Sequence, residues 1–169
     1  MLGLKRRVRV ETERLTLRLP EHGDWRQWSE LRETSAEFLV KWEPVWANDH
    51  LTRRAFTNRV YWAQRAEAQG QALPMLLIRR EDQQLLGALT LDNIRRGPAQ
   101  TGTFGYWIGQ GFARQGYMRE AILALTILPG SFGGSPFGRA STFSMPSVTC
   151  PQTVYWPSRK VASSNTMKN

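Results

Sequence analysis

Three glycines in the second half of the chain are the residues whose spacing best suits chemistry. Gly109, Gly111 and Gly116 separate a predicted strand from a predicted helix. A loop that ends at a helix N-terminus presents unpaired backbone N–H groups, and the helix dipole adds to their attraction for an anion. Gly116 has no Cβ to keep a phosphate from the backbone, and Arg114 places a positive charge nearby. The pattern favours a bound pyrophosphate, although many glycine-rich turns of this kind bind nothing.

Hydrophobic periodicity predicts the elements that must hold this loop. Residues 101–108 alternate between polar and apolar side chains, as a half-buried strand does, and residues 117–128 carry apolar side chains at helical spacing. Residues 73–79 and 84–91 predict two earlier strands, and residues 93–100 predict the turn that follows them. The three strands form an antiparallel meander, and the loop lacks a G-x-G-x-x-G pattern. A Rossmann dinucleotide site is therefore disfavoured.

The first half of the chain predicts one strand and two helices. Residues 15–19 alternate like a strand, Asp24 is expected to cap the first helix, and Thr52 is expected to cap a second helix that runs to about Gln69. Residues 38–46 predict an aromatic loop between the helices. The inward helix faces are expected to carry Trp25, Trp28, Leu31, Phe56, Val60 and Tyr61.

The size and composition predict one soluble domain. The chain has 169 residues, of which 41% are hydrophobic. No apolar run reaches the roughly 20 residues of a membrane helix, and the basic start lacks the apolar region of a signal peptide. Cys150 is the only cysteine and His22 and His50 are the only histidines, so neither an internal disulfide nor a Cys/His metal site is expected. We expect a cytoplasmic protein without membrane association.

A net charge of +9 favours partners rich in phosphate, such as RNA, ribosomes and coenzyme phosphates. An RNA- or ribosome-binding module without chemistry is therefore one alternative. A solvated surface is the simpler interpretation of the same charges. The arginines that could line a nucleic-acid-binding face are Arg53, Arg54, Arg59, Arg65, Arg95 and Arg96.

Four segments resemble the GNAT family of acetyltransferases, and especially its branch of ribosomal-protein-alanine N-acetyltransferases. The stretch from Phe104 to Ala121 resembles the family's acetyl-CoA motif, Q/R-x-x-G-x-G/A. When the motif is aligned on Gly116, Ala113 takes its first position and Met118 its last, and both depart from the general pattern. The other matching segments are residues 11–18, residues 38–44 (compared with F-L-x-x-W-E-P) and residues 86–97.

The resemblance implies an α/β (α+β) fold over residues 1–128, in which helices flank a mixed, mostly antiparallel sheet. It also implies acetyl-CoA as the cofactor, bound in a gap beside the strand that ends at Ile108. The backbone of Trp107 and Ile108 is expected to hold the pantetheine arm, and the amides of residues 114–118 the pyrophosphate. The full expected cofactor set is Trp107, Ile108, Gly109, Ala113, Arg114, Gln115, Gly116, Tyr117 and Met118.

The implied reaction is transfer of acetyl to the N-terminal amine of a protein, for which a ribosomal protein is the expected substrate. A small-molecule amine is the alternative within the same class. Glu43 is the candidate for holding or deprotonating the amine, because it lies in the family's substrate-side loop; a surface carboxylate is the competing interpretation. The expected substrate-binding residues are Trp42, Trp46, Asn93 and Tyr106.

The chain departs from the family pattern after residue 128. Residues 129–169 contain five of the nine prolines, four basic residues and no acidic residue, and we expect this tail to be poorly ordered. The family's later strands and its thiol-side acid have no counterpart here, so no catalytic acid is assigned. A frameshifted or truncated coding sequence is one hypothesis, and a degenerate remnant without activity is another. We also expect marginal stability, or completion of the sheet by a second copy in a homodimer.

Overall fold

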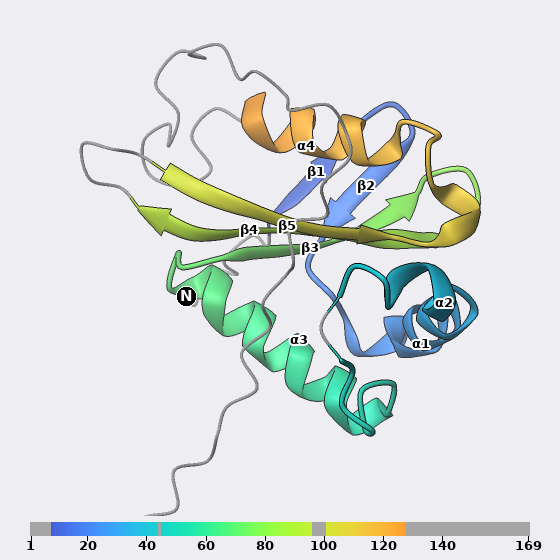
Figure 1. Cartoon of the computed structure of the whole chain (residues 1–169). Helices are drawn as coiled ribbons and strands as arrows, with labels where there is room; N and C mark the ends of the chain where they lie inside the picture. The colour runs from blue at the N-terminus through green and yellow to red at the C-terminus, as the bar shows by residue number, and fades with distance from the viewer. Residues whose placement is uncertain (1–7, 44, 96–100, 128–169) are drawn as a thin grey trace, which may run out of the picture.

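A sheet of five antiparallel strands forms the centre of the protein (Figure 1). The structure is a computed structural model that describes residues 8–43, 45–95 and 101–127. The strands lie in the order in which they occur along the chain, and each pairs antiparallel with its neighbour. They are β1 (Arg9–Glu11), β2 (Leu15–Arg18), β3 (Leu73–Arg79), β4 (Leu85–Arg95) and β5 (Thr101–Ile108).

Helices cover both faces of this sheet. Helices α1 (Trp25–Thr34), α2 (Ala36–Leu39) and α3 (Arg53–Ala68) lie on one face, and α4 (Tyr117–Ile127) lies on the other (Figure 1). Two 3-10 turns, η1 (His22–Asp24) and η2 (Gln110–Phe112), precede α1 and α4. The predicted α/β class, an antiparallel sheet flanked by helices, is confirmed.

The predicted meander is confirmed with one change of length. The strands at residues 73–79 and 101–108 have the predicted bounds, whereas β4 extends to Arg95. The turn predicted from Asn93 onward therefore begins too early. Asn93 has a positive φ of 51°, and the pairing of β4 with β5 is irregular between Asp92 and Arg95. Strand β4 thus contains an irregular residue, Asn93, before it ends.

The helix predictions were correct in position and wrong in three details. Thr52 caps α3 as predicted, because its Oγ1 accepts a hydrogen bond from the Ala55 amide at 3.2 Å. Asp24 stands at the start of α1 but does not cap it, since its carboxylate accepts hydrogen bonds from Arg18 at 2.6 and 2.7 Å. Tyr61 is 56% exposed rather than inward. The short helix α2 replaces part of the predicted aromatic loop.

The core consists of two clusters, and the alternation of the strands assigns residues to them. On β5, Trp107 belongs to one cluster, while Tyr106 and Ile108 pack against the other. The Trp107 cluster also contains Trp28, Leu39, Phe56 and Val60 from the helices α1 to α3. The Tyr106 cluster contains Tyr117, Ala121 and Leu125 of α4. The predicted tail, 129–169, lies outside the described residues.

Within the described ranges, no helix is long and apolar enough to cross a membrane.

Candidate functional site

The connection from β5 to α4 places a row of backbone N–H groups at a helix start. Arg114 and Gly116 both have positive φ angles, of 61° and 83°. The first hydrogen bond along the helix runs from the Glu120 amide to the Gly116 carbonyl at 3.0 Å, so the amides before Glu120 have no acceptor inside the helix. Alternating left-handed residues and a helix start together form a concave set of donors suited to an anion.

Hydrogen bonds between Arg14 and Glu120 connect the start of α4 to the sheet. Glu120 accepts hydrogen bonds from the Thr12 hydroxyl at 2.6 Å, from Arg14 Nε at 2.7 Å and from the Arg14 amide at 3.0 Å. The Arg14 guanidinium also donates to the Gln115 carbonyl at 3.1 Å. Burial opposes ionisation of Glu120, but these donors outweigh it and lower the pKa of Glu120.

Gly116 leaves room in this donor set that a side chain would fill. A Cβ at Gly116 would lie 3.4 Å from Nη2 of Arg14, and the positive φ of Gly116 would strain any L residue. The guanidinium of Arg14, whose side chain is 43% exposed, borders this space, and the amides at the helix start are its neighbours in sequence. The residues present therefore fit a phosphate or pyrophosphate group in charge and in space.

The first residue of the loop, Gly109, packs closely on α1. A Cβ at Gly109 would lie only 2.5 Å from Cδ1 of Leu31, so the absence of a side chain allows the helix to approach. The Gln110 amide donates to the Ser35 hydroxyl at 3.0 Å. These contacts connect the loop to the helices on the other face of the sheet.

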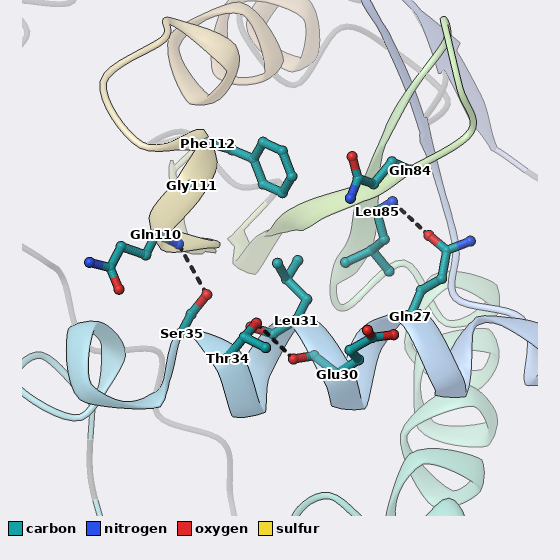
Figure 2. A pocket seen from close by; sticks show the side chains of 10 residues that line it. All are labelled: Gln27, Glu30, Leu31, Thr34, Ser35, Gln84, Leu85, Gln110, Gly111 and Phe112. Atoms are coloured by element: carbon teal, nitrogen blue, oxygen red, sulfur yellow. Dashed lines mark hydrogen bonds between the residues drawn. The ribbon is translucent and has the colours of Figure 1, made fainter.

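A groove of about 540 Å³ lies between α1, the start of β4 and η2 (Figure 2). Three apolar residues line the groove: Leu31, Leu85 and Phe112. The other lining residues are Gly111 and the polar residues Gln27, Glu30, Thr34, Ser35, Gln84 and Gln110. The Gln27 side-chain oxygen accepts a hydrogen bond from the Leu85 amide at 2.9 Å. None of the predicted site residues lines this groove.

A buried ion pair connects α1 to the segment that follows α2. The Arg32 guanidinium forms a two-pronged pair with Glu43, in which Nη1 lies 3.3 Å from Oε1 and Nη2 contacts Oε2. The Arg32 side chain is 4% exposed and that of Glu43 15% exposed. The indole N–H of Trp46 donates to Oε2 of Glu43 at 2.6 Å. Glu43 is thus held by three donors from two residues.

Aromatic rings enclose the Arg32 guanidinium. Its Cζ lies 4.5 Å from the ring centroid of Trp46, 4.7 Å from that of Trp107 and 5.5 Å from that of Trp28. Burial lowers the pKa of Arg32, and Glu43 opposes this shift. Because Trp107 lies on β5, Arg32 connects Glu43 to the strand that leads into the loop.

Arg59 and His50 complete this cluster. Arg59 of α3 lies over Trp28, with its Cζ 4.9 Å from the ring, and burial, reinforced by Arg32, lowers its pKa to about 10. His50 stacks on Trp46 with ring centroids 4.9 Å apart. Burial, then the charges of Arg32 and Arg59, lower the pKa of His50 to about 3. His50 is therefore neutral at neutral pH, and it is too weak a base to accept a proton there.

A model of the family described as the acetyltransferase (GNAT) domain matches residues 14–127. The chain belongs to the GNAT acetyltransferase family. It is 29% identical over 118 residues to the ribosomal protein uS5-alanine N-acetyltransferase of Escherichia coli (strain K12), a match that covers 70% of this chain and 61% of that relative. The chain thus spans less than two thirds of the length of this relative.

Solved acetyltransferases share the fold. The ribosomal-protein-S5-alanine acetyltransferase of Vibrio fischeri has a TM-score of 0.61 at 22% identity, covering 68% of this chain and 63% of that one. RimJ of Mycobacterium smegmatis, solved in complex with CoA-disulfide, has a TM-score of 0.61 at 21% identity, covering 69% of this chain and 59% of that one.

The structure of this GNAT domain separates the expected substrate-side residues. Glu43 and Trp46 lie together, whereas Trp42 is 50% exposed next to them in sequence. Tyr106 packs on the α4 side of β5, opposite to Trp107. Asn93 stands five residues along β4 from Ala88, the partner of Trp107, which places it about 17 Å away at the usual strand rise.

Arg14, Arg32, Arg59 and His50 were not predicted to belong to these sites. A spacing signal existed for Arg32, because it follows Trp28 by four residues and so lies on the same helical face. Arg14 falls within a segment that resembles the family, but nothing local indicates that it contacts Glu120, which is 106 residues away. Among the described residues, no group of three or more His, Cys, Asp or Glu could hold a metal ion.

Proposed function

We propose that this GNAT domain is an acetyl-CoA-dependent N-acetyltransferase that acts on the N-terminal amine of a protein. The observation that carries the proposal is the donor set at the start of α4, at the position of the family's acetyl-CoA motif. A ribosomal protein that begins with alanine is the proposed substrate. Support for that substrate comes from the relative, whose name specifies the alanine of ribosomal protein uS5.

Two parts of the chain would hold acetyl-CoA. The amides of residues 114–118 and the guanidinium of Arg14 would bind its pyrophosphate, because both supply donors around the space at Gly116. The backbone of Trp107 and Ile108 would hold its pantetheine arm. Among the described strands β5 pairs only with β4, which leaves the other edge of β5 available for hydrogen bonds.

When bound, acetyl-CoA supplies a thioester carbonyl that an amine can attack. A C–N bond forms at that carbon, the C–S bond breaks, the amine loses a proton and the sulfur gains one. Glu43 would hold the incoming amine close to β5, since Arg32 connects it to Trp107. Trp46 would support Glu43, and the exposed Trp42 would contact the peptide.

Mass spectrometry of a peptide substrate tests this proposal. The purified chain is incubated with acetyl-CoA and a peptide that begins with alanine, and the product is mapped by fragmentation. The proposal predicts one added acetyl group on the terminal nitrogen, and no addition to the same peptide with a blocked amine. Acetylation of small amines alone would point to the alternative substrate class, and a folded chain that acetylates neither would contradict the proposal.

One of the arginines proposed for a nucleic-acid-binding face does not belong to such a face in the structure. Arg59, one of six arginines proposed for a basic face, packs over Trp28 instead. Arg53, Arg54 and Arg65 are exposed on α3. No observation on the described residues favours this alternative over acetyl transfer.

A further inference from the structure

The hydrogen bonds of Glu43 leave one of its oxygens less occupied than the other. Among the described residues, Oε2 contacts Arg32 Nη2 and accepts from the indole N–H of Trp46, whereas the hydrogen bond of Oε1 is the longer one from Arg32 Nη1 at 3.3 Å. A carboxylate offers about four lone-pair sites, two on each oxygen. Within the described part of the chain, Oε1 therefore has more acceptor capacity left than Oε2.

Arg32 orients the carboxylate of Glu43, whereas the Glu43 backbone is held to α2 by a hydrogen bond from its amide to the Leu39 carbonyl at 3.1 Å. Glu43 lies in a turn after α2, while Arg32 lies within α1 and is enclosed by three tryptophan rings. A guanidinium holds a carboxylate by two parallel N–H groups, which fixes orientation as well as distance. Arg32 therefore holds the Glu43 carboxylate against the core.

We propose that Arg32 is a positioning residue that orients Glu43 so that Oε1 accepts one N–H from the terminal ammonium of a peptide. This inference rests on the proposed function and deepens it. Three donors fix the orientation of this carboxylate, and the inference assigns it a hydrogen bond to the amine rather than removal of a proton. Arg32 and Glu43 thus select an unblocked amine, and another group or water receives the proton.

Calorimetric titration of the full chain with an alanine-initiated peptide tests the inference without requiring turnover. The same peptide with an acetylated N-terminus is the control ligand. Arg32→Lys keeps the positive charge but loses the two parallel N–H groups of the guanidinium, and Glu43→Gln removes the negative charge. Each variant should weaken binding of the free-amine peptide by about 10-fold or more, the loss of a charge-assisted hydrogen bond. The double variant should bind no more weakly than the weaker single variant.

A matched control comes from another two-pronged ion pair. Arg18 and Asp24 pair at 2.6 Å and lie elsewhere on the fold, so Arg18→Lys should leave peptide affinity within about 2-fold. Acetyl-CoA affinity should be unchanged in all of these variants. If Arg32→Lys does not fold, Glu43→Asp replaces it: the shorter side chain keeps the charge but moves the carboxylate away from the Arg32 guanidinium, so affinity for the free-amine peptide should again fall by about 10-fold.

Three results would overturn the inference. These are additive losses in the double variant, equal binding of the acetylated peptide, and unchanged affinity in a folded Arg32→Lys or Glu43→Asp variant. In the acetyl-transfer assay, the inference predicts a raised KM for the peptide with little change in kcat, whereas loss of a base would lower kcat. A wild-type chain that binds free amines selectively but transfers no acetyl would refute the proposed function and leave the inference standing.

Discussion

The loop at the start of α4 and the arginine cluster around Glu43 are two different ways to hold charge. In the loop, the donors are mainly backbone amides from consecutive residues, and the space at Gly116 is open to an anion. In the cluster, the charges belong to side chains from α1, α3 and the segment after α2, and they are enclosed by aromatic rings. In the proposed function the loop receives the anion of a ligand, whereas the cluster already contains its own anion, Glu43.

This difference predicts opposite sensitivities. Under the proposed function, a change at the exposed residues 114–116 should alter cofactor binding more than stability, apart from the strain of a side chain at Gly116. A change in the cluster should alter stability first, because removal of one charge leaves its partner buried. Variants in each region test whether the loop and the cluster differ in this way.

The largest effect on stability is expected for Arg32→Met. Glu43 would then lose both guanidinium hydrogen bonds while 85% of its side chain stays buried, since it is 15% exposed. Removing one partner of a buried pair costs about 3–5 kcal/mol. The free energy of unfolding in urea would measure the loss.

The control for this variant is an exposed ion pair. Arg9 and Glu11 are 56% and 52% exposed, so Arg9→Met should cost no more than about 1 kcal/mol. An equal loss in the two variants would show that the cluster is no more important to stability than a surface pair.

The next effect is expected where the two regions meet, at Gly109. An alanine Cβ would lie 2.5 Å from Leu31 Cδ1 and 3.3 Å from Phe112 Cδ2, so the Leu31 side chain, α1 or the loop must shift. Overpacking of this kind costs about 1–3 kcal/mol. Thermal unfolding of Gly109→Ala and Gly111→Ala would provide the comparison, because a Cβ at Gly111 meets nothing within 4 Å. Similar losses in both would mean that α1 does not support the loop through this contact.

His50 is expected to give a pH dependence of stability. Its folded pKa of about 3 lies below the ordinary value of 6.5, so the unfolded chain binds more protons between these values. The contribution of His50 is therefore fully present above pH 6.5 and declines as the pH falls toward 3. His50→Phe keeps a ring against Trp46 and removes the titration, so it should flatten the stability profile between pH 6.5 and 4.5.

His22 is the matched control for this pH dependence, because the chain has only two histidines. His22→Phe should leave the slope in place. A slope that persists in His50→Phe and disappears in His22→Phe would place the titration outside the cluster.

Local patterns were sufficient to predict most of the fold. The meander and the helix capped by Thr52 follow from alternation, turn residues and a cap that all act within a few residues. The errors came from tertiary contacts: Asp24 bonds to Arg18 instead of capping α1, and β4 runs past Asn93 because β5 pairs with it that far. Residues 9–11 were not predicted as a strand, since β1 has only three residues.

The loop before α4 and the cluster around Glu43 differ in the same way: the loop depends on neighbouring residues, and the cluster depends on tertiary contacts. The sequence predicts an anion site at Gly116 and its neighbours because the loop is contiguous and the expected chemistry depends on backbone groups, and this site stays a prediction. The ion pair of Glu43 with Arg32 could not be predicted, because 11 residues and a change of direction separate them. Glu43 was expected either to hold or deprotonate the amine or to be a surface carboxylate, and its ion pair appears only when α1 and the segment after α2 come together.

Calorimetric titration with acetyl-CoA is the most direct test of the central claim. The wild-type chain should bind acetyl-CoA saturably, and Gly116→Asp should weaken binding by at least about 100-fold, because it adds a carboxylate where the pyrophosphate would lie. Gly111→Asp adds the same charge at a position with open space, and it should bind nearly as the wild type does. A folded wild-type chain without saturable binding, or a Gly116→Asp variant that binds normally, would contradict the assignment of the cofactor to this loop.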